Sequence, residues 1–223
     1  MSGEAASELI DPAFLFRFEF DLRRNDLSWS VRGGFDLPEE CRLPWPQSLN
    51  RPTGDTPPDI RLGWNDDGIG MTASVRGKRS AAWCRDSRPE DSDGVNLWID
   101  TRASAGVHRA SKYCHRFAVL PAGGGDDRQQ PCVVWLPIHR ARANPKTVEA
   151  TKIRVHAVER HDGYDLSASF PADQLTGYDP ANQPRISIHV VFKDRELGDR
   201  PLTIGPPYPV DEDPSLWTAA RLV

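Results

Sequence analysis

One segment in the middle of the chain alternates apolar and polar residues and carries a tryptophan among the polar ones. It runs Asp-Ser-Asp-Gly-Val-Asn-Leu-Trp-Ile-Asp-Thr-Arg over residues 91–102. Successive side chains of a strand point to opposite faces, so Asn96, Trp98 and Asp100 share one face and the apolar residues between them line a core. An indole stacks on apolar C–H faces, and amide or carboxylate groups bond hydroxyls. We expect a ligand to meet this polar face.

Three further side chains are candidates for the same binding site. Trp83, in the polar loop before the segment, is a second aromatic platform, and Arg102 and Arg116 are hydrogen-bond donors for ligand hydroxyls. The alternative is structural: Trp98 packs beneath a neighbouring loop and Trp83 anchors its own loop, since aromatic side chains are ordinarily buried for their area.

Two cysteines and two histidines form a candidate metal site near the same sheet edge: Cys84, His108, Cys114 and His115. Zinc is held by four such ligands in a tetrahedron. The spacing matches no standard zinc signature, and adjacent residues of a strand such as Cys114 and His115 point to opposite faces. The alternative is a buried thiol with surface histidines.

Acidic clusters could supply oxygen ligands for calcium, which takes six to eight of them. One cluster comprises Asp91, Asp93 and Asp100, and the other Asp66 and Asp67. Neither has EF-hand spacing, and acidic loops also cap strands and face water. The sequence therefore leaves two alternatives open: a protein that binds calcium or zinc, and a protein without a cofactor.

The sequence carries no recognisable catalytic arrangement. There is no Gly-x-Ser-x-Gly motif, and the glycines at 123–125 are not followed by the Lys-Ser or Lys-Thr of a phosphate-binding loop. Nothing in the sequence singles out two of its 32 acidic residues as a hydrolytic pair. An enzymatic activity is unsupported.

Alternation with a period of two predicts strands along most of the chain. The expected strands are 14–22, 60–64, 69–75, 95–100, 113–120, 133–138, 152–158, 164–170, 185–193 and 216–223, with a weaker stretch at 27–37. Asn65–Gly68 and His161–Gly163 are hairpin turns, 171–175 allows one helical turn, and the proline-rich residues 44–59 form a connection. We predict an all-β fold: an antiparallel β-sandwich of about nine to eleven strands, in one domain over residues 14–223 after a tail at 1–13.

Composition narrows the class of protein. The 223 residues carry a net charge of -4 with no basic stripe, which disfavours nucleic acid as a partner. No apolar run reaches membrane-spanning length and no signal peptide is visible, so we expect a cytoplasmic protein. The cysteines show no CxxC pair and are expected to be thiols; Cys84 and Cys114 are the first choice if one bridge exists.

Four segments in order carry a resemblance to a known family: Trp64–Met71, Asp93–Asp100, Gly163–Leu175 and Asp213–Trp217. Together they resemble the family nine carbohydrate-binding modules, within the wider group of DOMON-like sandwiches. The resemblance implies a module that binds sugar, often attached to xylanases and other glycoside hydrolases, with calcium in some members.

The resemblance also implies where a sugar would lie. In such modules it lies between two tryptophans, one just before the acidic strand and one just before the Asp-Pro-Ser segment. Alignment places Glu90 and Asp211 at these positions, and neither is aromatic. A family glutamate inside the strand aligns with Asn96, which can still donate and accept hydrogen bonds.

Three functional hypotheses follow. The first is a non-catalytic protein that binds a mono- or oligosaccharide by stacking and hydrogen bonds, linked to carbohydrate catabolism. The second is a protein-interaction or structural sandwich that has lost the sugar site, which predicts a broad apolar patch. The third is a small metal-binding or hydrolytic protein built on Cys84, His108 and Cys114.

Overall fold

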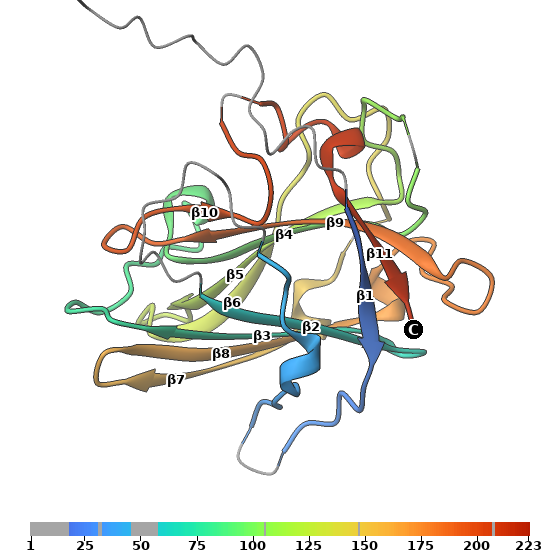
Figure 1. Ribbon diagram of the computed structural model, residues 1–223. Helices are drawn as coiled ribbons and strands as arrows, with labels where there is room; N and C mark the ends of the chain where they lie inside the picture. The colour runs from blue at the N-terminus through green and yellow to red at the C-terminus, as the bar shows by residue number, and fades with distance from the viewer. Residues whose placement is uncertain (1–17, 31–32, 46–57, 105, 147, 207) are drawn as a thin grey trace, which may run out of the picture.

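The computed structural model describes residues 18–30, 33–45, 58–104, 106–146, 148–206 and 208–223 (Figure 1). The strands are β1 (Glu19–Arg24), β2 (Asp59–Asn65), β3 (Gly68–Arg76), β4 (Gly94–Asp100), β5 (Cys114–Gly124), β6 (Gln130–Trp135), β7 (Arg154–Arg160), β8 (Gly163–Pro171), β9 (Arg185–Lys193), β10 (Arg200–Pro201) and β11 (Thr218–Leu222). Single 3-10 turns are η1 (Glu39–Cys41), η2 (Pro89–Asp91), η3 (Ala150–Lys152), η4 (Ala172–Gln174) and η5 (Pro214–Leu216). No helix within these ranges has the length and apolarity needed to span a membrane.

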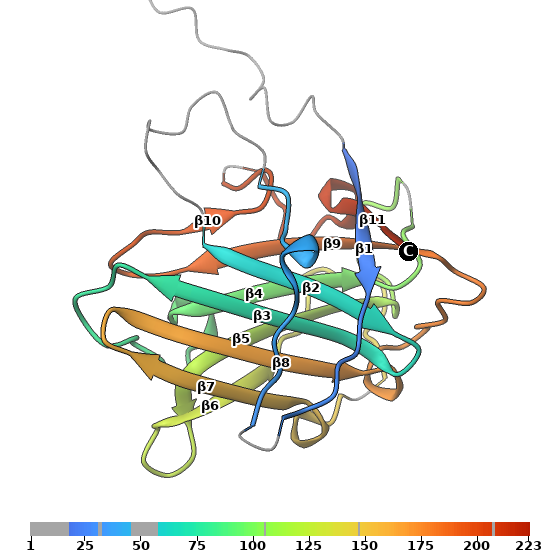
Figure 2. The same ribbon diagram turned by 60° about the horizontal axis from the view of Figure 1, so that its bottom comes forward.

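The strands form two layers that face each other, as predicted. Sheet A has the order β6-β5-β4-β9-β11, with β10 on β9, and sheet B has the order β2-β3-β8-β7 (Figures 1 and 2). Strand β1 pairs with both β11 and β2 and so links the sheets. These two pairings are parallel, whereas the others are antiparallel. The long connection over residues 25–58 permits the parallel return from β1 to β2.

One core lies between the two layers and draws on both. From β4 it takes Val95, Leu97 and Ile99, each at most 1% exposed, and from β8 it takes Phe170. The β2–β3 hairpin needs glycine at position 68, because a Cβ there would lie 2.1 Å from the Phe170 carbonyl oxygen. The alternation of side chains along β4 thus places Val95, Leu97 and Ile99 on its internal face. The opposite face of β4 belongs to the outer face of sheet A.

Most predicted strands are confirmed. Residues 185–193 match β9, and both predicted hairpins occur as β2–β3 and β7–β8. The weak stretch at 27–37 is not a strand in its described part, where it is a loop whose Leu27 and Leu37 lie next to glycines of β3 and β2. Residues 14–17 of the first predicted strand and 46–57 of the proline-rich connection lie outside the described residues.

Candidate functional site

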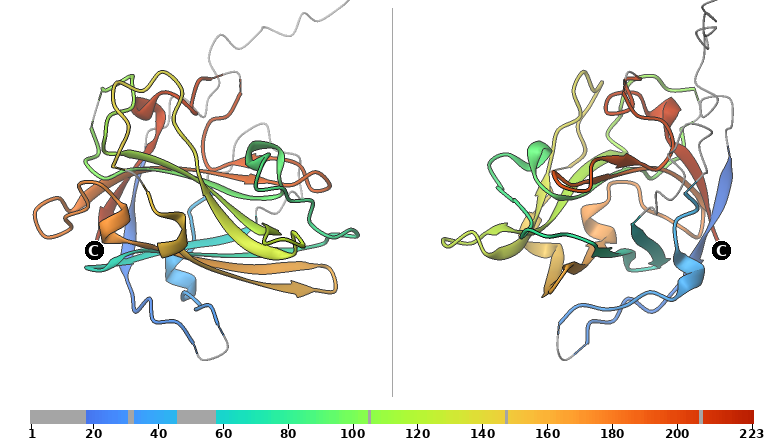
Figure 3. Two further views of the ribbon diagram at one scale, coloured as in Figure 1. Left: turned by 180° about the vertical axis from the view of Figure 1, so that it is seen from behind. Right: turned by 60° about the vertical axis from the view of Figure 1, so that its left-hand side comes forward.

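The outer face of sheet A is covered by loops and does not face open solvent. Asn96, Trp98 and Asp100 point to this face as predicted, yet they are only 3%, 2% and 1% exposed. Trp98 packs with four side chains that are also buried: Ala110, Cys114, Ile138 and Trp217. The loops that carry Ala110, Ile138 and Trp217 lie above the face of sheet A that points away from sheet B (Figures 1 and 3). The expectation that Trp98 presents its indole to solvent is wrong, because alternation specifies a face and not what covers it.

Arg116 lies directly over the Trp98 ring. The two residues are cross-strand neighbours on β5 and β4, and the guanidinium carbon is 4.9 Å from the ring centroid. Arg116 Nη1 is 2.9 Å from Glu90 Oε1 and Arg116 Nη2 is 3.9 Å from Asp211 Oδ2. The guanidinium is thus held between an indole below and two carboxylates above, an arrangement that combines a cation–π contact with ion pairs.

The two carboxylates reach Arg116 from loops far apart in the sequence. Glu90 belongs to η2, just before β4, and Asp211 precedes η5. Their side chains are 62% and 55% exposed, whereas that of Arg116 is 10% exposed. The positions at which the family resemblance places two tryptophans are therefore brought together in space around one arginine. We call Glu90, Arg116 and Asp211 the arginine clamp.

Several polar atoms beneath the clamp have no hydrogen-bond partner among the described residues. They are Asn96 Oδ1, Trp98 Nε1, Arg116 Nε and both ring nitrogens of His189. His189 is the cross-strand neighbour of Trp98 on β9, and the two ring centroids are 5.3 Å apart. Complete burial lowers the pKa of His189 to about 3, so the ring is neutral. Each unpartnered buried group costs about 1–3 kcal/mol, and a bound water or ligand would satisfy it.

The other predicted ligand residues are engaged elsewhere. The Asp100 carboxylate accepts hydrogen bonds from the backbone N–H groups of Arg102 and Ser104, at 3.0 and 2.8 Å, and so caps the turn after β4. The Arg102 guanidinium lies 5.3 Å from the Tyr113 ring centroid. Of the six predicted residues, Trp98 and Arg116 are in contact at the clamp, and Asn96 lies on the same face two residues before Trp98. Asp100 and Arg102 lie at the end of the strand.

Trp83, the sixth, belongs to a second polar cluster at the start of β4. Its ring is half-buried and lies 3.4 Å below the Arg195 guanidinium. Its backbone N–H donates to Asp93 Oδ2 at 3.0 Å. Trp83 is therefore placed as an anchor of its own loop, the structural alternative to a sugar platform.

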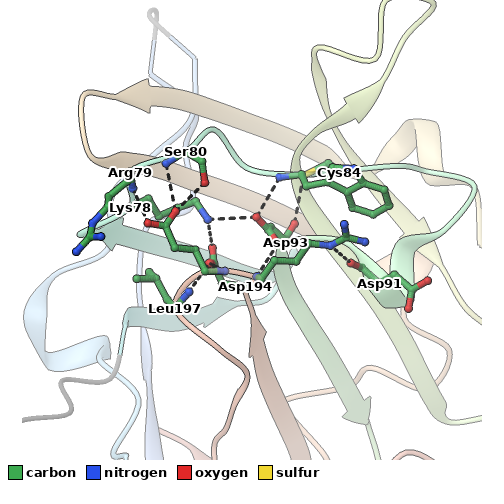
Figure 4. Close-up of polar contacts among 11 residues, drawn as sticks. Lys78, Arg79, Ser80, Cys84, Asp91, Asp93, Asp194 and Leu197 are labelled. Atoms are coloured by element: carbon green, nitrogen blue, oxygen red, sulfur yellow. Dashed lines mark hydrogen bonds and ion pairs between the residues drawn. The ribbon is translucent and has the colours of Figure 1, made fainter.

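The centre of this second cluster is Lys78, which lies between two buried aspartates (Figure 4). Lys78 Nζ donates to Asp194 Oδ2 at 2.5 Å and to Asp93 Oδ2 at 3.2 Å, and the three side chains are at most 3% exposed. Asp194 Oδ1 accepts from the backbone N–H groups of Glu196 and Leu197. Burial alone lowers the pKa of Lys78, but its bonds to Asp194 and Asp93 outweigh this and raise it above the ordinary value. The sequence gives no sign that this loop lysine is buried.

The four predicted zinc ligands are not brought together. Cys84 packs with Ala118 and Leu120, whereas Cys114 packs with Trp98. The described residues contain no group of three or more His, Cys, Asp or Glu side chains arranged to hold a metal ion.

The histidines of that set also have other roles. His108 is 75% exposed and bonds Asp213, and His115 stacks on Phe117 at the core face. Burial lowers the pKa of His115 to about 4, and the nearby Thr176 backbone opposes this in part.

The cysteines are thiols. None of the four is disulfide-bonded, so the Cys84–Cys114 bridge considered above is not formed. Burial raises the pKa of Cys84 to about 12 and that of Cys114 to about 11. Both are uncharged at neutral pH and are poor metal ligands in this state.

Four of the five carboxylates considered for calcium, all but Asp67, have partners among the described residues. Asp93 binds Lys78, Asp91 binds Arg88 at 2.7 Å, and Asp66 binds Arg24. Asp100 accepts from backbone N–H groups. In the structure these aspartates stabilise loops and strand ends.

No protein-family model matches the chain, and no curated protein matches it. Similar solved structures are those of a family 9 carbohydrate-binding module from Caldicellulosiruptor kristjanssonii. Its glucose complex has a TM-score of 0.58 at 13% identity, covering 93% of this chain and 96% of that one. Its cellotriose complex has a TM-score of 0.53 at 12% identity, covering 92% and 93%. The chain has the fold of the family 9 modules.

Proposed function

We propose that the chain binds a mono- or oligosaccharide at the arginine clamp on the outer face of sheet A. The observation that carries the proposal is the convergence of Glu90 and Asp211, from two distant loops, on Arg116 above Trp98. The glucose- and cellotriose-bound modules of the same fold support sugar as the ligand class. A guanidinium and carboxylates suit the donor and acceptor character of sugar hydroxyls.

The burial of Trp98 favours hydrogen bonding over stacking as the main binding mode. With Arg116 over the indole, a sugar ring reaches Trp98 only after the guanidinium moves aside. The exposed carboxylates of Glu90 and Asp211 accept from sugar hydroxyls without such movement. In this proposal Asn96 and the Trp98 N–H lie beneath the ligand and bind it through water.

The alternative of a protein-docking surface is less well supported. It predicts a broad exposed apolar patch, yet Val223 is the one large hydrophobic side chain classed as exposed in the described part of the chain. No observation of this structure favours it over sugar binding.

Calorimetric titration with glucose, cellobiose and cellotriose tests the proposal. The E90Q/D211N double variant keeps the shapes of both side chains and removes the acceptor charges, and Arg116→Ala removes the donor. Each charged hydrogen bond contributes about 1.5–3 kcal/mol, so either variant is expected to weaken binding roughly 10- to 100-fold. Arg221→Ala, which breaks a surface pair with Asp21 at 2.7 Å, is the matched control and leaves affinity unchanged.

Two results would overturn the proposal. One is the absence of saturable binding of all three sugars to the wild-type protein. The other is binding that survives E90Q/D211N unchanged while far-ultraviolet circular dichroism shows that the variant is folded.

A further inference from the structure

A separate pocket lies at one end of the sandwich. It has a volume of about 370 Å³ and lies between the loop after β3, the β7–β8 hairpin and the neighbouring parts of β5 and β6. Pro121, Ala122, Pro131 and Ala157 form small apolar parts of its wall, and polar or charged side chains form much of the rest. No residue of the arginine clamp lines it. A volume near the lower end of the ligand-pocket range suits a small, one-ring ligand.

Two arginine side chains lie at the mouth of this pocket. Arg79 and Arg160 line it and are exposed, and the one carboxylate among the lining residues is that of Glu159. Arg79 has no ion pair among the described residues. Basic groups at the mouth of a small concave site concentrate anions there.

The carboxylate that pairs with Arg160 is shared with a second arginine. Asp165 is shared between Arg160 and Arg76, with N–O distances of 2.7 and 2.6 Å, so two guanidinium groups face one carboxylate. Glu196 binds the backbone N–H of Arg79 at 2.9 Å. Lys78 also lines the pocket, but its charge is neutralised by the two buried aspartates described above.

A polar group without a partner lies deeper in the wall. Tyr164 is 3% exposed, and its hydroxyl has no hydrogen-bond partner among the described residues. Burial raises the pKa of Tyr164 well above its ordinary value, so the hydroxyl stays protonated and can donate. Ser80 and Gln129 add neutral polar side chains to the lining. A ligand hydroxyl would satisfy a buried phenol that otherwise costs about 1–3 kcal/mol.

We infer that this end pocket binds a small anionic ligand, whose carboxylate or phosphate is held by Arg79 and Arg160 and whose hydroxyl is held by Tyr164. Guanidinium groups bind both kinds of anion through paired N–H donors. Sugar acids and sugar phosphates combine such an anion with hydroxyls on a single ring. The inference goes beyond the proposed function, because it concerns a different site and a charged ligand.

Calorimetric titration with glucuronate, glucose 6-phosphate, inorganic phosphate and glucose tests this inference. We expect one-to-one binding of at least one of the two sugar anions, weakened about tenfold or more in Arg79→Ala and in Tyr164→Phe. Tyr164→Phe keeps the ring and removes only the unpartnered hydroxyl, so it is expected to fold with unchanged or higher Tm. Arg221→Ala is the control for loss of a surface arginine.

The outcomes separate this site from the arginine clamp. Anion binding that persists in Arg116→Ala but is lost in Arg79→Ala supports the inference, whether or not neutral glucose binds. Tighter binding of glucuronate or of glucose 6-phosphate identifies the preferred anion as a carboxylate or a phosphate. Displacement of a bound sugar anion by inorganic phosphate shows that the phosphate group alone is recognised. The inference is overturned if neither sugar anion saturates the protein at concentrations up to about 10 mM, because a dissociation constant above this value is weaker than that of a millimolar ligand. It is also overturned if binding is the same in Arg79→Ala and Tyr164→Phe as in the wild type.

Discussion

Strand β4 begins where the buried polar groups have hydrogen-bond partners and continues through a region where several buried polar groups have none within the described ranges. At its start, both Asp93 carboxylate oxygens have partners: Oδ2 accepts from Lys78 and the Trp83 N–H, and Oδ1 accepts from the Arg195 N–H. Further along the strand, Asn96 Oδ1 and Trp98 Nε1 have none among the described residues. Both regions are buried, so burial alone does not explain the difference.

The comparison separates polar groups that hold the fold from polar groups that are available for binding. The Lys78 cluster joins the loop after β3 to the start of β4 and to the residue after β9, and thereby ties sheet B to sheet A. The unpartnered polar groups beneath the arginine clamp make no hydrogen bonds that connect one strand or loop to another in the described part of the chain. Natural proteins satisfy buried polar groups except where function requires otherwise, so the second region is the better candidate for a ligand.

The largest expected effect is the loss of Lys78. Lys78→Met leaves two buried aspartates without their cation, and breaking a buried ion pair in this way costs about 3–5 kcal/mol. Asn96→Leu, in contrast, removes an amide whose oxygen is unpartnered and is expected to change the free energy of unfolding by less than about 1 kcal/mol. Urea denaturation of both variants measures the difference. Equal losses in the two variants would contradict the distinction between the two regions.

The next effect is a pH dependence that originates at His189. The pKa of His189 is lowered to about 3 in the folded state, so between this value and its ordinary value near 6.5 only the unfolded chain binds the proton. Stability therefore falls as the pH decreases, by about 1.4 kcal/mol per pH unit for one such group. His115, with a pKa of about 4, acts in the same direction.

A variant isolates the contribution of His189. From pH 6.5 to pH 4.5, His189→Phe is expected to lose about 2–3 kcal/mol less stability than the wild-type protein, as measured by urea denaturation at each pH. Aspartates with lowered pKa values, such as Asp213, lose their stabilisation at lower pH and add little in this window. The same pH slope in variant and wild type would show that His189 is not buried as a neutral ring.

A smaller effect compares two buried thiols, one in each region. Cys84 Sγ donates to the Asp93 carbonyl at 3.3 Å, and Cys114 packs against Trp98. If the loops over the outer face open more readily than the Lys78 cluster, Cys114 is exposed at a lower free energy. We expect a disulfide reagent at pH 8 to label Cys114 at least about tenfold faster than Cys84, measured by mass spectrometry of peptides. Faster labelling of Cys84 would reverse the comparison.

The sheet framework could be predicted because its signals are local. Period-two alternation specified β9 over 185–193, and the Asn65–Gly68 and His161–Gly163 turns specified both hairpins. The parallel pairing of β1 could not be predicted, since it depends on which strands the long connection brings together.

The binding face was predicted only in part for a similar reason. Alternation placed Asn96 and Trp98 on the correct side of β4, but the residues that cover Trp98 come from three other segments: Ala110, Ile138 and Trp217. The family alignment placed Glu90 and Asp211 at the positions of two tryptophans, but their convergence on Arg116 was not predicted. Lys78 was missed because an isolated lysine in a polar loop is ordinarily exposed, and its partner Asp194 is distant in sequence.

A crystal structure of the protein with glucose or cellotriose tests the central claim most directly. The account predicts sugar bound at the arginine clamp, with hydroxyls within hydrogen-bond distance of Glu90, Arg116 or Asp211. Sugar bound only at another surface, with Arg116 still paired to both carboxylates as in the ligand-free protein, would contradict it.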